Sequence, residues 1–409
     1  MCRKRPDMEV ILKIALVLAL MVALLARRVP LGPVMLAASL ALGLLFGMSP
    51  GAMGLAALRA AVDFRTTVYL VIILYLISVL ENLLRTGGLL ARMVTALRVI
   101  FRDHRLVASF MPAFIGFLPS AGGAMFSAPL VREATRSLGL SPGRLTFINY
   151  WFRHIWEAVF PLYPGLILAA ALAGLPVSAL IYRMWPYPVM AVAAGWMLSW
   201  TGVPRETDGA AGDVKKAWRD ALLTMAPVLF VIVAVVALRI DLALMTGLAC
   251  LGLAAGLRLP PKKIPQLLWQ AFKPMTLLLI VGVMVFKGML EASGAVAALP
   301  GVLAAHRIPQ VLIIFLLPFL TGFLTGISQG YVAVSFPLLL GMMGPPGGDL
   351  GWYVLAFISG LFGVYLSPSH LCLVLTREYF GAGWGGVYKR LLPASLAVLA
   401  LAVALYYLL

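Results

Sequence analysis

The segment "FRHIWEAVFPLYPG", residues 152–165, concentrates ionisable side chains inside a long apolar run. His154 and Glu157 lie three positions apart, which places both on one face of a helix. Ionisable side chains within an apolar run of membrane-crossing length indicate function. His154 and Glu157 together could relay protons, and Arg153 could face an anionic solute. The alternative is a structural ion pair near the membrane interface.

Small and helix-breaking residues interrupt two further apolar runs, at "GFLPSAGG" (116–123) and "TGISQG" (325–330). Non-helical backbone at membrane depth persists only where protein or a water-filled cavity covers it. Each break therefore predicts a re-entrant hairpin, whose hydroxyls, amides and helix N-terminus suit an anion or a dehydrated cation. The alternative is that Gly and Ser only allow close helix packing. The candidate binding residues are Ser120, Ala121, Gly122, Gly123, Thr325, Gly326, Ser328 and Gln329.

A third polar cluster lies in "YLSPSHLCL", residues 365–373, with Ser367, Ser369 and His370 around Pro368. His370 is either proton-active or a hydrogen-bonded core histidine. We predict no metal site, because a di-metal centre in a helix bundle needs two H-x-x-E motifs and the chain has one. No cofactor is expected. The cysteines at positions 2, 250 and 372 are too scattered for a disulfide framework and are expected to pack in the core.

Residues 326–330 also read G-x-S-x-G, the pattern of a hydrolase nucleophile elbow. That motif requires a strand, a sharp turn and a helix, which this segment does not predict. An intramembrane hydrolase using Ser328 with His154 or His370 would also leave the break at 116–123 unexplained. We therefore expect no enzyme.

The composition requires a membrane environment for these segments. The chain has 409 residues, of which 62% are hydrophobic and 11% charged, far more apolar than a soluble domain. The apolar runs are too long for barrel strands, so they predict helices. The net charge of +17 comes from basic residues in short loops, as expected of membrane topology rather than nucleic acid binding. Membrane-crossing helices are predicted at 9–26, 30–48, 66–84, 145–173, 177–201, 218–238, 240–257, 273–291, 351–375 and 387–408.

A weak internal repeat relates the two halves. Shifting the chain by 206 positions places Gly116 on Gly322 and Pro112 on Pro318. Further along, a shift of 207 positions lays "FPLYPGLIL" (160–168) over "SPSHLCLVL" (367–375). An odd number of crossings per half makes the repeats inverted, as in secondary transporters. The prediction is an all-α polytopic membrane protein with about ten transmembrane helices and two re-entrant hairpins. Its parts are repeat 1–205 (hairpin 106–131, broken helix 145–173), linker 206–217 and repeat 218–409 (hairpin 309–341, broken helix 351–375).

The distribution of Lys and Arg gives an orientation. Most of them fall in loops of one parity, including 85–144 and 205–219. The positive-inside rule places these loops in the cytoplasm and both termini outside, with the first hairpin opening to the cytoplasm. The expected location is the plasma or inner membrane.

The quoted breaks also carry a resemblance. "NYWFRHIWEAVFPLYPGLILAAAL" and "GFLPSAGGAMFSAPLV" resemble the membrane family called domain of unknown function 401. The repeat pattern is similar to the ion transporter superfamily, which includes divalent anion/sodium symporters and gluconate permeases. The resemblance implies an elevator mechanism in a homodimer, with solute and sodium sites at the hairpin tips. The superfamily's Ser-Asn-Thr triplets are absent at 119–121 and 325–327, which favours proton coupling through His154 and Glu157.

The predicted function is secondary active transport of a small anionic solute, of carboxylate type, coupled to a proton or sodium gradient. The expected partners are that solute, the coupling ion, the lipid bilayer and a second copy of the chain. A cation/proton exchanger is the alternative within transport, and an intramembrane serine hydrolase is the more distant one.

Overall fold

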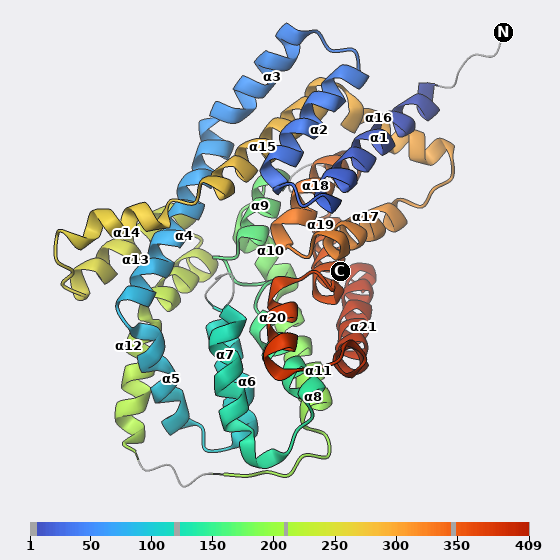
Figure 1. Cartoon of the computed structure of the whole chain (residues 1–409). Helices are drawn as coiled ribbons and strands as arrows, with labels where there is room; N and C mark the ends of the chain where they lie inside the picture. Colours follow the sequence, from blue (N-terminus) through green and yellow to red (C-terminus); the bar gives the residue numbers. More distant parts are fainter. Residues whose placement is uncertain (1–5, 118–122, 208–211, 345–348, 409) are drawn as a thin grey trace.

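The computed structural model describes residues 6–117, 123–207, 212–344 and 349–408. These residues form helices joined by short loops, with one isolated β-bridge between Asp103 and Thr207 (Figure 1). The first half contains α1 (Pro6–Ala26), α2 (Leu31–Leu45), α3 (Pro50–Val62), the π-helical η1 (Phe64–Val68), α4 (Tyr69–Thr86), α5 (Leu89–Ile100), α6 (His104–Ile115), α7 (Gly123–Ala134), the 3-10 helix η2 (Arg136–Leu138), α8 (Pro142–His154), α9 (Pro164–Ala173), α10 (Val177–Met184) and α11 (Pro186–Trp200).

The second half follows a similar order. It contains α12 (Val214–Ile232), the π-helical η3 (Val233–Ala237), α13 (Leu242–Gly256), α14 (Lys263–Ala271), α15 (Pro274–Ala292), α16 (Ala295–Ala305), α17 (Gln310–Thr325), α18 (Ser328–Met343), α19 (Leu350–Leu366), α20 (Leu371–Phe380) and α21 (Trp384–Leu408). The inverted relation of the halves, and the division at 206–217, stay predictions.

The described residues hold six helical stretches long and apolar enough to cross a membrane. A seventh would be the pair α9–α10, which bends by 113°. The protein is therefore a multi-pass membrane protein with an all-helical fold. Shorter apolar helices include α2 and α13, which the sequence pattern predicts as full crossings, so the expected number of about ten stays a prediction.

The main difference from the predicted helices lies before residue 66. The stretch containing α3, η1 and α4 runs from Pro50 to Thr86, whereas the apolar pattern predicted only 66–84. The extension begins at a capped N-terminus, where the Ser49 hydroxyl accepts a hydrogen bond from the Ala52 amide and Pro50 takes a first-turn position. A second unpredicted helix, α14, is too short and polar to give an apolar signal.

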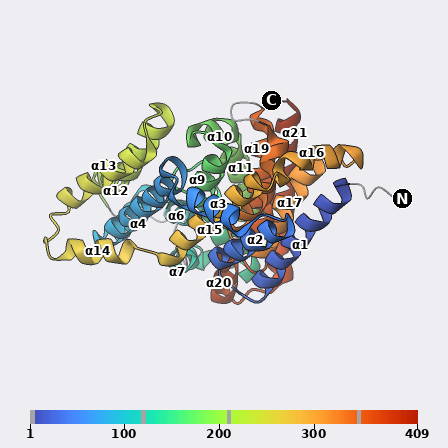
Figure 2. The same ribbon diagram turned by 90° about the horizontal axis from the view of Figure 1, so that it is seen from above.

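The helices form two packed groups (Figures 1 and 2). One contains α1–α4 and α12–α15, in which α15 packs on α2 and α3, and α13 packs on α4. The other contains the hairpins α6–α7 and α17–α18, the broken pairs α8–α9 and α19–α20, and the helices α11 and α21. Within it, α18 packs against α9 and α20 packs against α7 and α8, so each half's hairpin meets the other half's broken pair.

Two glycines allow the hairpins to approach the broken pairs closely. A Cβ atom at Gly116, which ends α6, would lie 2.2 Å from the carbonyl oxygen of Arg153 in α8. A Cβ atom at Gly322 in α17 would lie 2.2 Å from the carbonyl oxygen of Gly360 in α19. The 206-position shift aligns these two glycines, so the halves share one packing contact as well as one pattern.

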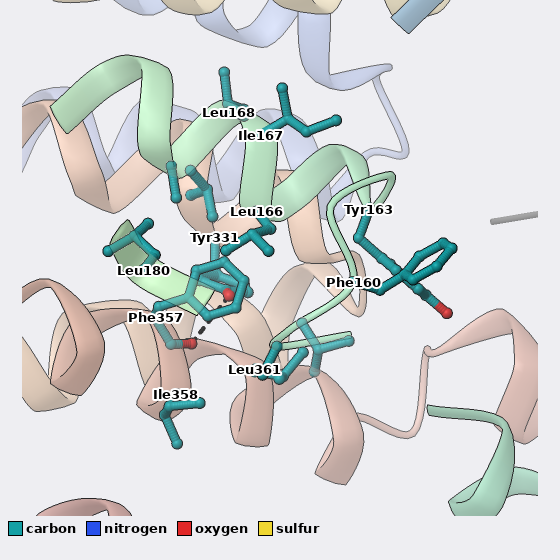
Figure 3. Packing of buried hydrophobic residues seen from close by; sticks show 14 of the residues in the cluster. Phe160, Tyr163, Leu166, Ile167, Leu168, Leu180, Tyr331, Phe357, Ile358 and Leu361 are labelled. Atoms are coloured by element: carbon teal, nitrogen blue, oxygen red, sulfur yellow. Dashed lines mark hydrogen bonds between the residues drawn. The ribbon is translucent and has the colours of Figure 1, made fainter. Parts of the chain in front are cut away.

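Buried tyrosines hold the second group together. Tyr331 of α18 donates a hydrogen bond to the Phe357 carbonyl at 3.0 Å (Figure 3). Tyr150 of α8 donates to the Tyr365 carbonyl at 3.0 Å, and Tyr365 donates back to the His154 carbonyl at 2.5 Å. The last two bonds join the helices that precede the two breaks, and so fix one break relative to the other.

Candidate functional site

A cavity of about 300 Å³ lies where the two broken pairs meet the second hairpin. The helix α8 ends at His154 and α9 begins at Pro164, whose ring suits a first helical turn. The helix α19 ends before Ser367, and His370 is the N-cap residue of α20. The lining residues are Arg153, His154, Glu157, Tyr163, Pro164, Gly165, Gly326, Ile327, Ser328, Gln329, His370, Leu371 and Cys372.

The carboxylate of Glu157 is the acidic group of this lining. Glu157 is buried, and its Oε2 accepts a hydrogen bond from the Ser328 hydroxyl at 3.1 Å. Its Oε1 lies 3.9 Å from His154 Nε2. The Ser328 hydroxyl is thus directed at a carboxylate at the start of α18, in a helix–turn–helix rather than the strand–turn–helix of a nucleophile elbow.

Two buried imidazoles face each other across the break. His154 Nδ1 lies 2.5 Å from the Tyr150 carbonyl oxygen, and His370 Nδ1 lies 2.8 Å from the Gly326 carbonyl oxygen. The two Nε2 atoms are 3.2 Å apart. His154, His370 and Cys372 each offer one potential metal-ligand atom, a ring nitrogen or the Sγ, and these three atoms all lie within 4.8 Å of one another.

The structure brings seven of the predicted site residues to this cavity: Arg153, His154, Glu157, Gly326, Ser328, Gln329 and His370. Ser367 and Ser369 lie beside it, and their hydroxyls are hydrogen-bonded at 2.8 Å. Thr325 hydrogen-bonds the Ile327 carbonyl inside the hairpin turn at 3.4 Å. These three residues shape the backbone around the cavity.

Little of the predicted site in the first hairpin falls within the described residues. Ser120, Ala121 and Gly122 lie outside the described residues, whereas Gly123 is buried at the start of α7. The neighbouring Ala124 carbonyl accepts a hydrogen bond from the Asn149 amide at 3.1 Å, and that amide also contacts the Thr376 hydroxyl at 3.1 Å. Asn149 therefore ties the beginning of α7 to both broken pairs.

Sequence reasoning missed two polar residues of the lining, Tyr163 and Cys372. Tyr163 donates a hydrogen bond to the Gly116 carbonyl at 2.7 Å. Cys372 lies two positions after His370, and the H-x-C spacing was the available signal for a joint role. A lone cysteine in a long apolar chain is more readily interpreted as a packing residue.

The fold and the site define a class: a polytopic helical membrane protein whose broken helices meet at a cavity lined by several ionisable side chains. Within that class, the chain belongs to the family described as "Protein of unknown function (DUF401)", whose profile matches residues 9–409. Among curated proteins, none matches the chain. The fold is similar to the crystal structure of the YdaH transporter of Alcanivorax borkumensis, with a TM-score of 0.57 and 16% sequence identity, over 82% of this chain and 84% of that chain.

Proposed function

We propose that the protein is a secondary active transporter of a small anionic solute, of carboxylate type, driven by a proton or sodium gradient. The observation that carries the proposal is the cavity between two broken helix pairs, to which both halves contribute buried ionisable side chains. Ionisable side chains at membrane depth are costly, and their grouping around a cavity marks a solute or ion pathway. The fold that the chain shares with YdaH, which is named a transporter, supports the proposal.

The cavity offers separate places for an anion and a cation. Arg153 and the amides at the N-terminus of α18, beginning at Ser328, present positive charge to a carboxylate. Glu157 presents a buried carboxylate to the coupling cation. Solute and coupling ion of opposite charge would then neutralise each other within one site.

The division into two packed groups supports an elevator mechanism. The second hairpin and the broken pairs carry the cavity lining, whereas α1–α4 and α12–α15 contribute nothing to it within the described chain. In the proposed mechanism the first set moves the solute past the second, which acts as a scaffold in a homodimer. Membership in the ion transporter superfamily is part of this proposal.

Uptake into proteoliposomes tests the function after thermal-shift screening of carboxylates and sugar acids has identified a stabilising solute. Glu157→Gln should reduce gradient-driven uptake more than tenfold, because the amide cannot hold the coupling cation. Glu291→Gln is the matched control, since its carboxylate is exposed at the end of α15 and should leave uptake unchanged. Imposing a pH or a sodium gradient separately identifies the ion. Unchanged uptake by the Glu157 variant would overturn the coupling role, and failure of every gradient to drive uptake would overturn transport.

A further inference from the structure

The protonation of the two facing imidazoles follows from their hydrogen bonds. A backbone carbonyl oxygen can only accept, so Nδ1 of His154 and Nδ1 of His370 each carry a proton and donate it. In neutral rings both Nε2 atoms then hold a lone pair, and these lone pairs face each other across 3.2 Å. Such an arrangement is repulsive unless a cation lies between the two nitrogens.

The geometry matches that of a transition-metal site. Two nitrogens bound to one tetrahedral Zn²⁺ at about 2.0–2.1 Å lie about 3.3 Å apart, close to the observed 3.2 Å. A metal-binding histidine typically donates its other ring N–H to a backbone carbonyl or carboxylate, which fixes the tautomer. Both histidines make this bond to a carbonyl, from opposite halves of the chain.

A third ligand and the required charge are present. The Cys372 Sγ lies within 4.8 Å of a ring nitrogen of each histidine, and its side chain lines the cavity, which gives an ion a route in. Arg153 lines the same cavity, and its positive charge opposes a cation. A Cys372 thiolate and the Glu157 carboxylate, 3.9 Å from His154 Nε2, supply two negative charges against it.

We propose that His154, His370 and Cys372 bind one divalent transition-metal ion of the zinc type, beside the Glu157 carboxylate. Imidazole and thiolate ligands select Zn²⁺ and similar ions over Ca²⁺ and Mg²⁺, which require several oxygen ligands. The bound ion joins the end of α8 to the start of α20, and so links the two broken pairs. This site goes beyond the proposed function, since it depends neither on the solute nor on transport.

Cobalt titration of the purified protein in detergent tests the site directly, because Co²⁺ replaces Zn²⁺ and is coloured. The protein is first stripped with a chelator, and Cys2→Ser removes the cysteine near the N-terminus. One equivalent of Co²⁺ should produce the visible absorption of a tetrahedral ion and a thiolate charge-transfer band in the near ultraviolet. Zn²⁺ should displace it, and Mg²⁺ should not.

Matched variants assign the ligands. Cys372→Ser should abolish the charge-transfer band, and His370→Ala should weaken binding by at least about tenfold, the lower end of the loss seen when even an outer partner of a metal ligand is removed. Cys250→Ser is the control, because that thiol lies in α13 and contacts the Leu76 carbonyl. Saturable one-to-one binding lost only in the cavity variants supports the proposal. Absence of saturable binding by the parent protein, or equal binding by the His370 variant, overturns it and leaves a shared proton between the rings. The readout requires no uptake, so it fails or succeeds independently of the transport proposal.

Discussion

Tyr163 and His370 occupy equivalent positions in the two broken pairs but differ in the polar contacts they make. The alignment of "FPLYPG" with "SPSHLC" places one over the other. Each donates a hydrogen bond to the glycine that ends the first helix of its own hairpin, Tyr163 to the Gly116 carbonyl and His370 to the Gly326 carbonyl. The phenol has no further polar atom, whereas the imidazole has a second nitrogen that faces His154. Both side chains thus donate to the C-cap glycine of a hairpin helix, and only the imidazole offers a second polar atom to the cavity.

The residues that precede the two hairpins also differ in their polar groups. Asp103 is the N-cap residue of α6, and its carboxylate accepts a hydrogen bond from the Arg105 amide. The equivalent position before α17 is Pro309, which makes no side-chain cap. The second hairpin therefore lacks the polar cap of the first. The two halves therefore share their close glycine contacts but differ in the polar groups around their hairpins.

The shared packing should give the largest effect. Gly116→Ala and Gly322→Ala each place a methyl group 2.2 Å from a backbone oxygen, so two helices must separate. Each substitution should cost about 1–3 kcal/mol, the usual range for overpacking a core. Thermal unfolding followed by intrinsic fluorescence measures the loss. Gly252→Ala is the control, since no atom lies within 4 Å of its added Cβ. A large loss for only one of the two glycines would break the equivalence of the halves.

Substituting Tyr163 and His370 separates the effect of their hydrogen bonds on stability from the proposed metal binding. Tyr163→Phe and His370→Phe each delete one hydrogen bond to a hairpin carbonyl, so both should lower stability by about 0.5–1.5 kcal/mol. Only His370→Phe should also lose cobalt binding, because only that ring reaches His154. Chemical denaturation and cobalt titration of the same preparations measure both effects. Equal metal binding by the two variants would contradict the asymmetry.

The smallest effect is expected at Asp103, outside the membrane-spanning segments. Burial raises the pKa of its carboxyl, but hydrogen bonds and charge from Arg105, with the charge of Arg205, outweigh burial and hold the pKa below its usual value of 3.8. Because folding lowers this pKa, the ionised carboxylate stabilises the folded protein when the pH is above the usual pKa of 3.8. The stabilisation is lost as the pH falls through the lowered pKa of the folded state.

Asp103→Asn keeps a capping side chain and removes the charge, so near neutral pH it should cost at most about 1 kcal/mol. Thermal midpoints compared between about pH 6 and about pH 3 should converge for the parent and the variant on the acid side. A gap that stays constant over this range would show that the charge of Asp103 adds nothing.

Helix-level features were within reach of the sequence. Prolines and glycines inside apolar runs predicted breaks near Pro164, Pro368 and residue 327, and α8–α9, α19–α20 and α17–α18 are interrupted there. The hairpin tip predicted near residue 120 lies outside the described residues. The α3 helix was missed, because its small residues give a weak apolar pattern while its N-terminus depends on a local cap at Ser49.

The contents of the cavity were only partly predictable. Spacing of three residues placed His154 with Glu157, but nothing in the sequence shows that His370 approaches His154 to 3.2 Å. That approach depends on the tertiary packing of α20 against α8. Cys372 joins the cluster through the same packing, which is why its type alone indicated only a core residue.

The separation of the two imidazoles along the chain has a consequence for biosynthesis. Arg153, His154 and Glu157 enter the membrane with the first half, while Ser328 and His370 belong to helices made about two hundred residues later. Until those helices are made, these three ionisable side chains lack cavity neighbours that they have in the finished protein. The cavity lining is therefore complete only once α20 has been translated.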